Sequence, residues 1–264
     1  MIVALIDNGS LEPAAHRNLR SVAAAVSGRT GVNVRAVSWK HSDRIPESEL
    51  DQTPAWALEP FVRSLVALGQ REFVFVPFFI SDQGAIGSAL RRDLETLQQE
   101  LGEFDFRFTA GLAGQGVIPA IVADRVRACS ARHALNAPPV VVVDHGGPSA
   151  TSAQLRDKLV AEIGLALGRE AGPVTAASME GEYPPLLAEQ LRHEPFASRE
   201  TVVAPLFLSP GRHAGPDGDL AQICRAVHPH SHLTELVGTH PFAIDALAGA
   251  LRTTLSTVQA ESYA

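Results

Sequence analysis

The chain has 264 residues, of which 45% are hydrophobic and 19% charged, and its formal net charge is −7. This length and apolar content allow two domains with buried cores. The charge includes no run of basic residues, so no nucleic-acid partner is expected. The longest apolar stretches, such as residues 73–80, fall short of the ~20 residues of a membrane span, so no membrane partner is expected either.

The cellular compartment is predicted from the cysteines and the N-terminus. Cys129 and Cys224 lie far apart and outside any CxxC motif, which argues against a disulfide scaffold. No basic segment precedes the apolar residues 1–7, so they are expected to form a strand and not an export signal. These features predict a cytoplasmic protein.

In chain order, the strand at residues 1–7 is followed by a turn that contains Gly9. Residues 12–28 then carry apolar side chains at helical spacing, with Gly28 as the predicted C-cap. Further strands, each followed by a helix, are predicted in three later segments, which are 32–40, 73–87 and 106–121.

The second half of the chain repeats this order. The segments 141–151, 173–180, 201–215 and 230–244 line up with 4–15, 32–40, 73–87 and 106–121. Strands that alternate with helices indicate parallel sheets with right-handed crossovers. We therefore predict an α/β fold of two doubly wound, three-layer domains, 1–134 and 135–264, related by a pseudo-twofold axis. Because the fused halves form an internal pair, a monomer is expected.

Three matched strand ends carry different residues in the two halves. Asn8 corresponds to His145, Lys40 to Glu180, and Ala85 to His213. Loops at the carboxyl ends of parallel strands are where such folds hold their ligands. Two imidazoles and a carboxylate suit a divalent first-row metal, and three protein ligands leave coordination positions open. The second half is therefore predicted to hold a metal site whose copy in the first half is degenerate.

Three segments resemble the class II tetrapyrrole metal chelatases of the sirohydrochlorin type, in their long, tandem-domain form. They are "HGG" after the strand at 141–144, "SMEGEYPPLLAEQL" (178–191) and "APLFLSPGRHAGPDGDL" (204–220). The resemblance implies a lyase that inserts cobalt(II) or iron(II) into sirohydrochlorin, in cobalamin or sirohaem biosynthesis. The metal would be a substrate, with nickel and zinc as in-vitro alternatives, and no nucleotide cofactor is implied.

The resemblance also implies the role of each site residue. His145 and His213 would bind the metal, and Glu180 would be their acidic partner and the general base for the pyrrole protons. Contacts to the many substrate carboxylates are expected from donors near the strand ends, including backbone N–H groups at helix N-termini. These are Arg212, Gly146, Gly147, Ser10 and Lys40.

Plainer interpretations remain open for several residues. A strand-end histidine can simply cap a helix or fill a polar turn, and Asp217 and Asp219 are predicted to be N-caps. The histidines at 228, 230 and 232 align with Phe104, Phe106 and Phe108 and would share one side of a strand, although Pro229 favours a loop. The alternative function is a non-catalytic protein that binds or delivers metal or tetrapyrrole.

Overall fold

The computed structural model describes residues 1–81, 85–147 and 149–262, with only the backbone described for 85, 86 and 262. The chain divides into two compact units. The first consists of Met1–Gln115 together with Pro241–Ala264, and the second of Gly116–His240.

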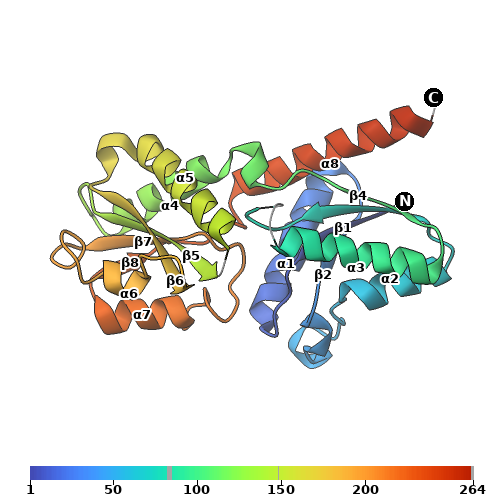
Figure 1. Ribbon diagram of the computed structural model, residues 1–264, viewed down its shortest axis with the longest axis horizontal. Coiled ribbons are helices and arrows are strands. Elements are labelled where there is room, and N and C mark those ends of the chain that lie inside the picture. Colours follow the sequence, from blue (N-terminus) through green and yellow to red (C-terminus); the bar gives the residue numbers. More distant parts are fainter. Residues whose placement is uncertain (82–84, 148, 263–264) are drawn as a thin grey trace. The chain divides into compact units, whose positions relative to one another are not determined.

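In the first unit, strands and helices alternate along the chain (Figure 1). The strands are β1 (Ile2–Asp7), β2 (Val34–Ser38), β3 (Glu72–Pro77) and β4 (Asp105–Phe108). The helices are α1 (Pro13–Thr30), α2 (Leu58–Ala67), α3 (Ala85–Leu101) and α8 (Pro241–Ser262). Helix α1 ends three residues later than predicted, because Gly31 and not Gly28 adopts the left-handed C-cap conformation.

The second unit repeats the pattern. Its strands are β5 (Val140–Gly147), β6 (Val174–Gly181), β7 (Thr201–Pro205) and β8 (Ser231–Leu233). Its helices are α4 (Ile118–Arg132), α5 (Ala150–Leu167), α6 (Leu187–Gln190) and α7 (Asp219–Val227).

Both sheets have four parallel strands in the same spatial order. The first runs β2-β1-β3-β4 and the second β6-β5-β7-β8. In each sheet the first strand in the chain is an inner strand. The second strand is added on one side of it, and the third and fourth strands are added on the other side, which is the doubly wound arrangement. The predicted fold class, two similar α/β units with parallel sheets, is confirmed.

The two units differ from the predicted ranges 1–134 and 135–264 in their terminal helices. Helix α4 packs on α5 and β7 in the second unit, whereas α8 packs along α1 in the first. There Arg29 Nε donates to the Asp245 carboxylate at 2.7 Å. A sequence repeat aligns helices by their order, but the apolar residues of a helix decide which sheet it covers. The alignment of the two halves therefore could not show that α4 belongs to the second unit and α8 to the first.

The cores are built from the inner strands and the helices that cover them. One core cluster of the first unit combines aliphatic side chains with several phenylalanines, including Phe61, Phe73, Phe75 and Phe104. In the second unit, Val140–Val143 of β5 are fully buried, as expected for an inner strand of a parallel sheet with helices on both faces.

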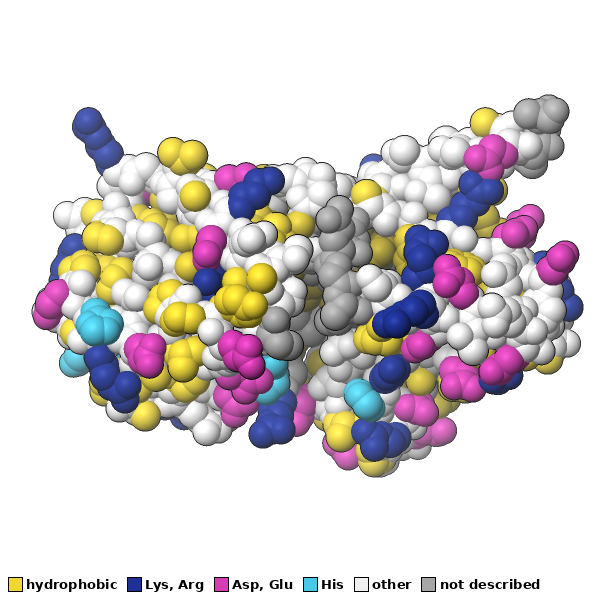
Figure 2. Space-filling view, viewed as in Figure 1, with side chains coloured by type: hydrophobic (Ala, Val, Ile, Leu, Met, Phe, Trp, Pro, Cys, Tyr) yellow, Lys and Arg dark blue, Asp and Glu magenta, His cyan; other side chains and the backbone are white. Residues whose placement is uncertain are grey.

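The molecular surface is mixed in charge. Figure 2 shows acidic and basic side chains interspersed over the described part of the face in view. No helix of the described residues has the length and apolar character needed to cross a bilayer.

Candidate metal site at the strand ends of the second unit

The predicted metal site lies at the carboxyl end of the second sheet. His145 and Glu180 are carried by the ends of the neighbouring strands β5 and β6, and His213 lies in the loop between β7 and α7. Residues 140–143 of β5 and 202–205 of β7 are apolar and buried, and exposed polar residues appear where β5 and β6 leave the core.

The structure brings the three predicted side chains together. His145 Nε2 lies 3.3 Å from His213 Nε2 and 3.6 Å from the nearer carboxylate oxygen of Glu180. Two imidazole nitrogens that share one metal ion at about 2.1 Å in tetrahedral geometry are separated by about 3.4 Å. The histidine pair is thus spaced as a shared metal would require.

The site is open. The side chains of His145 and Glu180 are 47% and 61% exposed. Within the described ranges, no group of three or more His, Cys, Asp or Glu side chains is arranged to hold a metal ion together. The geometry therefore offers a pair of imidazoles with a carboxylate beside it, and not a closed three-ligand cage. An open pair suits a metal that must arrive and leave.

Asp219 is a site residue that the sequence interpretation assigned to another role. Gly218 and not Asp219 is the N-cap of α7, and the Asp219 carboxylate lies 2.6 Å from His213 Nδ1. A carboxylate that accepts the Nδ1 proton fixes the imidazole tautomer and directs Nε2 at the metal. No sequence pattern marks this contact, because it depends on how the turn before α7 brings residues six apart together.

We expect Asp219→Asn to lower cobalt(II) affinity by about 10-fold to 100-fold, because an amide orients the imidazole and raises its basicity less well. Titration of the metal-free protein measures this. Asp217→Asn is the matched control, since the Asp217 carboxylate is 89% exposed and pairs with Arg225 at 3.1 Å. Equal affinities in the two variants would rule out the orienting role of Asp219.

Glycine is required where β5 passes the backbone of Glu180. Gly146 has φ +86°, and a Cβ atom there would lie 1.7 Å from the Glu180 carbonyl oxygen. Gly9 in the first unit has φ +88° and the same 1.7 Å approach to the Lys40 carbonyl oxygen. These matched contacts support the predicted correspondence of Lys40 with Glu180.

A buried polar chain lies beneath the site. Ser178 Oγ donates to the Asp144 carboxylate at 2.6 Å, and Arg156 donates to Ser178 Oγ at 2.5 Å. Arg156 also donates to the Tyr183 carbonyl at 3.2 Å, and its side chain is 3% exposed. Burial raises the pKa of Asp144, which the Ser178 hydroxyl and the Arg156 charge oppose. This chain ties β5, β6 and the loop after Glu180 together.

The corresponding strand ends of the first unit lack this chemistry. Asn8 is exposed at the end of β1, and Ala85 is the first residue of α3. Lys40 lies over the Trp39 ring and forms an ion pair with Asp93, with Nζ 3.7 Å from the carboxylate. The charge of Lys40 is therefore already paired, and its predicted contact to substrate would have to compete with Asp93.

Asp7, the counterpart of Asp144, is buried without an ion pair among the described residues. Burial raises its pKa to about 6, although the Ser38 hydroxyl and the Gly9 N–H favour the charged form. Leu19 of α1 corresponds to Arg156, because α1 and α5 both have 18 residues and begin at Pro13 and Ala150. His16, one turn earlier on α1, is also buried. Burial lowers the pKa of His16 to about 4, so it stays neutral at pH 7. The first unit has thus lost the buried cation as well.

We expect Asp7→Asn to stabilise the protein at neutral pH. Because the folded pKa of Asp7 is raised from 3.8 to about 6, its contribution to the unfolding free energy falls as the pH rises through that window. The variant should gain about 1–3 kcal/mol near pH 7.5 and little near pH 4. Urea unfolding at both pH values measures this, and a loss of stability near pH 7.5 would show that the charged form is favoured by the fold.

The other predicted substrate contacts lie around the same strand ends. Arg212 is 79% exposed and its Nε is 3.8 Å from the Asp219 carboxylate. Gly146 and Gly147 do not lie at the N-terminus of α5, because they extend β5 and pair with Glu180 and Gly181 of β6. Their N–H groups are therefore not the helix N-terminal donors that were expected. In the first unit, the Ser10 N–H donates to Ser42 Oγ at 3.2 Å.

The histidine-rich segment does not line one side of a strand. Strand β8 begins at Ser231, and its register places His232 opposite Val202, the position that Arg107 holds in the first sheet. The predicted alignment of His232 with Phe108 was therefore wrong by one residue. His228 is buried against the Arg199 carbonyl. The His232 ring contacts the His133 ring at a tilt of 32°, and its Nε2 lies 3.3 Å from the Glu200 carboxylate. These contacts favour a structural role.

Three solved structures share this fold along nearly their whole length. "SirB from Bacillus subtilis with Fe3+" matches with a TM-score of 0.68 at 13% identity over 98% of both chains. CbiX, the "terminal Enzyme for Biosynthesis of Siroheme in Denitrifying Bacteria", matches with a TM-score of 0.68 at 17% identity over 96% of this chain and 99% of its own. The cobalt complex of the sirohydrochlorin chelatase SirB from Bacillus subtilis subspecies spizizenii gives 0.65 at 14%, over 96% and 95%.

The sequence by itself gives no such match. No family model matches the chain, and neither does any curated protein. At 13 to 17% identity the likeness lies in the fold, and it agrees with the resemblance carried by the "HGG" and "PLFLSPGRH" segments. The chain has the fold of the sirohydrochlorin chelatases.

Proposed function

We propose that the chain is a metal chelatase that inserts cobalt(II) or iron(II) into sirohydrochlorin, on the way to cobalamin or sirohaem. The observation that supports this most is the histidine pair, whose Nε2 atoms lie 3.3 Å apart beside the Glu180 carboxylate. Cys129 and Cys224 are both free and buried, which fits a reducing compartment such as the cytoplasm.

Insertion requires that the metal loses its other ligands stepwise while two pyrrole N–H groups lose their protons. His145 and His213 would bind the incoming metal through Nε2 and leave its remaining positions to water and then to pyrrole nitrogen. Glu180 would accept the two pyrrole protons one after the other at its carboxylate and release each to solvent, to which its side chain is 61% exposed. Neither free cysteine belongs to the proposed site, so no thiolate there would hold a borderline metal too tightly to transfer.

The alternative is a protein that binds metal or tetrapyrrole without catalysis. A carrier has no need of a base beside an open pair of ligands, and Glu180 therefore favours the enzyme. Incubation with sirohydrochlorin and cobalt(II), followed by macrocycle absorbance, separates the two functions. The chelatase predicts saturable acceleration over the protein-free rate. Stoichiometric cobalt binding without acceleration would identify a carrier.

Glu180→Gln tests the proton role separately from metal binding. The amide keeps the shape of the side chain but removes the base, so the single-turnover insertion rate should fall by about 10²-fold to 10⁴-fold. Cobalt(II) affinity should fall much less. The exposed Glu182→Gln, two residues along the chain, is the control and should leave both values unchanged. A large loss of affinity with unaltered insertion would make Glu180 a ligand instead of the base.

A further inference from the structure

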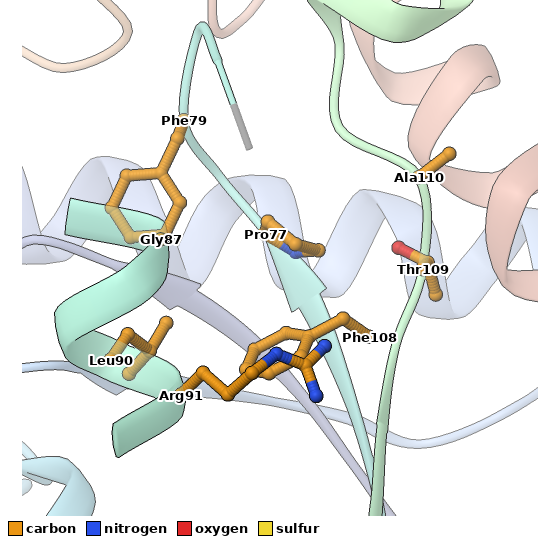
Figure 3. Close-up of a pocket in the computed structure, with 8 residues that line it drawn as sticks. All are labelled: Pro77, Phe79, Gly87, Leu90, Arg91, Phe108, Thr109 and Ala110. Atoms are coloured by element: carbon orange, nitrogen blue, oxygen red, sulfur yellow. The ribbon is translucent and has the colours of Figure 1, made fainter. Parts of the chain in front are cut away.

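The first unit contains a cavity of about 350 Å³ at the carboxyl end of β3. Its walls include Pro77 at the end of β3, Phe79 in the loop that follows, Leu90 on α3 and Phe108 at the end of β4 (Figure 3). Pro77 and Phe79 correspond to Pro205 and Phe207 of the second unit. The cavity therefore lies at the same strand ends that carry the metal site in the other half, but its lining combines the rings of Pro77, Phe79 and Phe108 with the polar side chains of Arg91 and Thr109.

One cation borders this cavity. The guanidinium of Arg91 lies 5.1 Å from the centre of the Phe108 ring, and Figure 3 shows it in front of that ring. The part of the chain that the structure describes gives Arg91 no ion pair or hydrogen bond. A stacked guanidinium keeps its planar set of donors available for a carboxylate.

A buried hydroxyl also borders the cavity. Thr109 is 4% exposed, and its Oγ1 has no hydrogen-bond partner among the residues that the structure describes. Figure 3 shows this oxygen on the side of Pro77. The corresponding Thr234 of the second unit, whose N–H makes the matched bond to β7, donates its hydroxyl to the Glu235 carbonyl at 3.0 Å. A buried unsatisfied hydroxyl destabilises a folded protein, so its retention at Thr109 points to a ligand that supplies the partner.

We propose that this cavity binds an aromatic carboxylate of one or two rings. The flat ring would pack between Phe79 and Leu90, the carboxylate would pair with the Arg91 guanidinium, and the Thr109 hydroxyl would donate to the ligand. The volume is close to the lower limit of about 300 Å³ for ligand pockets, which fits a ligand of this size. This site uses none of the residues of the proposed chelatase site, so the first half has been converted to another use.

Indole-3-acetate is the probe, and indole-3-acetamide is its uncharged counterpart. Saturation-transfer NMR with the full chain should give saturable binding of the carboxylate with a Kd at or below about 1 mM, and at least tenfold weaker binding of the amide. Arg91→Gln should remove the preference for the carboxylate. Arg92→Gln is the matched control, because Arg92 is exposed on the same helix and does not line the cavity.

Thr109→Val provides a second readout that a folding defect could not imitate. It removes the unsatisfied hydroxyl at nearly constant volume, so the melting temperature should stay the same or rise while probe binding weakens by about threefold to tenfold. His145→Ala should bind the probe as the wild type does, which keeps this test separate from chelatase activity. Equal binding of the two probes, no saturation by 5 mM, or wild-type binding in both Arg91→Gln and Thr109→Val would overturn the proposal.

Discussion

His145→Ala and His213→Ala should each abolish cobalt insertion while leaving the fold intact. A single remaining imidazole cannot hold the metal in place beside Glu180, because the pair with Nε2 atoms 3.3 Å apart is what offers two ligands to one ion. The side chains are 47% and 30% exposed, so neither contributes much to the core. Turnover with sirohydrochlorin and circular dichroism should be measured on the same samples.

Asn8→Ala is the control for both histidine variants. Asn8 corresponds to His145 in the repeat and is exposed at the end of β1, where Lys40 has replaced the acidic partner. Its replacement should leave insertion near the wild-type rate. If Asn8→Ala proved as damaging as His145→Ala, the first half would not be degenerate, and near-normal turnover in a folded histidine variant would remove that histidine from the site.

Gly146→Ala should destabilise the second unit and abolish insertion together. The new Cβ would lie 1.7 Å from the Glu180 carbonyl oxygen, and φ +86° is unfavourable for alanine, so β5 and β6 must separate where the site residues lie. We expect the unfolding free energy to fall by more than about 2 kcal/mol. Urea unfolding and single-turnover insertion measure the two effects.

Two further glycine variants separate stability from activity. Gly9→Ala meets the same 1.7 Å approach in the first unit, so it should destabilise that unit while insertion per folded molecule stays nearly normal. Gly28 lies within α1, and outside its own helix turn no described atom lies within 4 Å of the new Cβ, so Gly28→Ala should be neutral or slightly stabilising. Full insertion by folded Gly146→Ala would show that the close approach to Glu180 is not needed for the site.

Much of the fold and the central residues of the site could be predicted from the sequence. Strand-end residues are easy to locate where the pattern changes abruptly from β-branched to polar or small, as after Val143, which Asp144, His145 and Gly146 follow. Once a repeat fixes the strand order, parallel topology brings such ends to one edge of the sheet. His145, Glu180 and His213 were found in this way, and the structure brings them together.

Contacts between residues without a shared pattern were not predictable. The contact of Asp219 with His213 depends on the path of the turn around Gly218. Because this turn makes Gly218 the N-cap of α7, the prediction that Asp219 is the N-cap was wrong. Arg156 looks like an ordinary polar residue of α5 until β6 is packed against it. The cavity beside Thr109 required the sheet, helix α3 and the unpaired hydroxyl to be known together.

Transfer of cobalt from the loaded protein to sirohydrochlorin tests the central claim most directly. The chain is loaded with one equivalent of cobalt(II), mixed with excess sirohydrochlorin, and followed by macrocycle absorbance in a single turnover. If His145 and His213 present the metal and Glu180 accepts the protons, bound cobalt should enter the macrocycle faster than an equal concentration of free cobalt. Insertion that is slower from the loaded protein than from free cobalt would contradict the account, because the histidine pair would then store the metal and not transfer it.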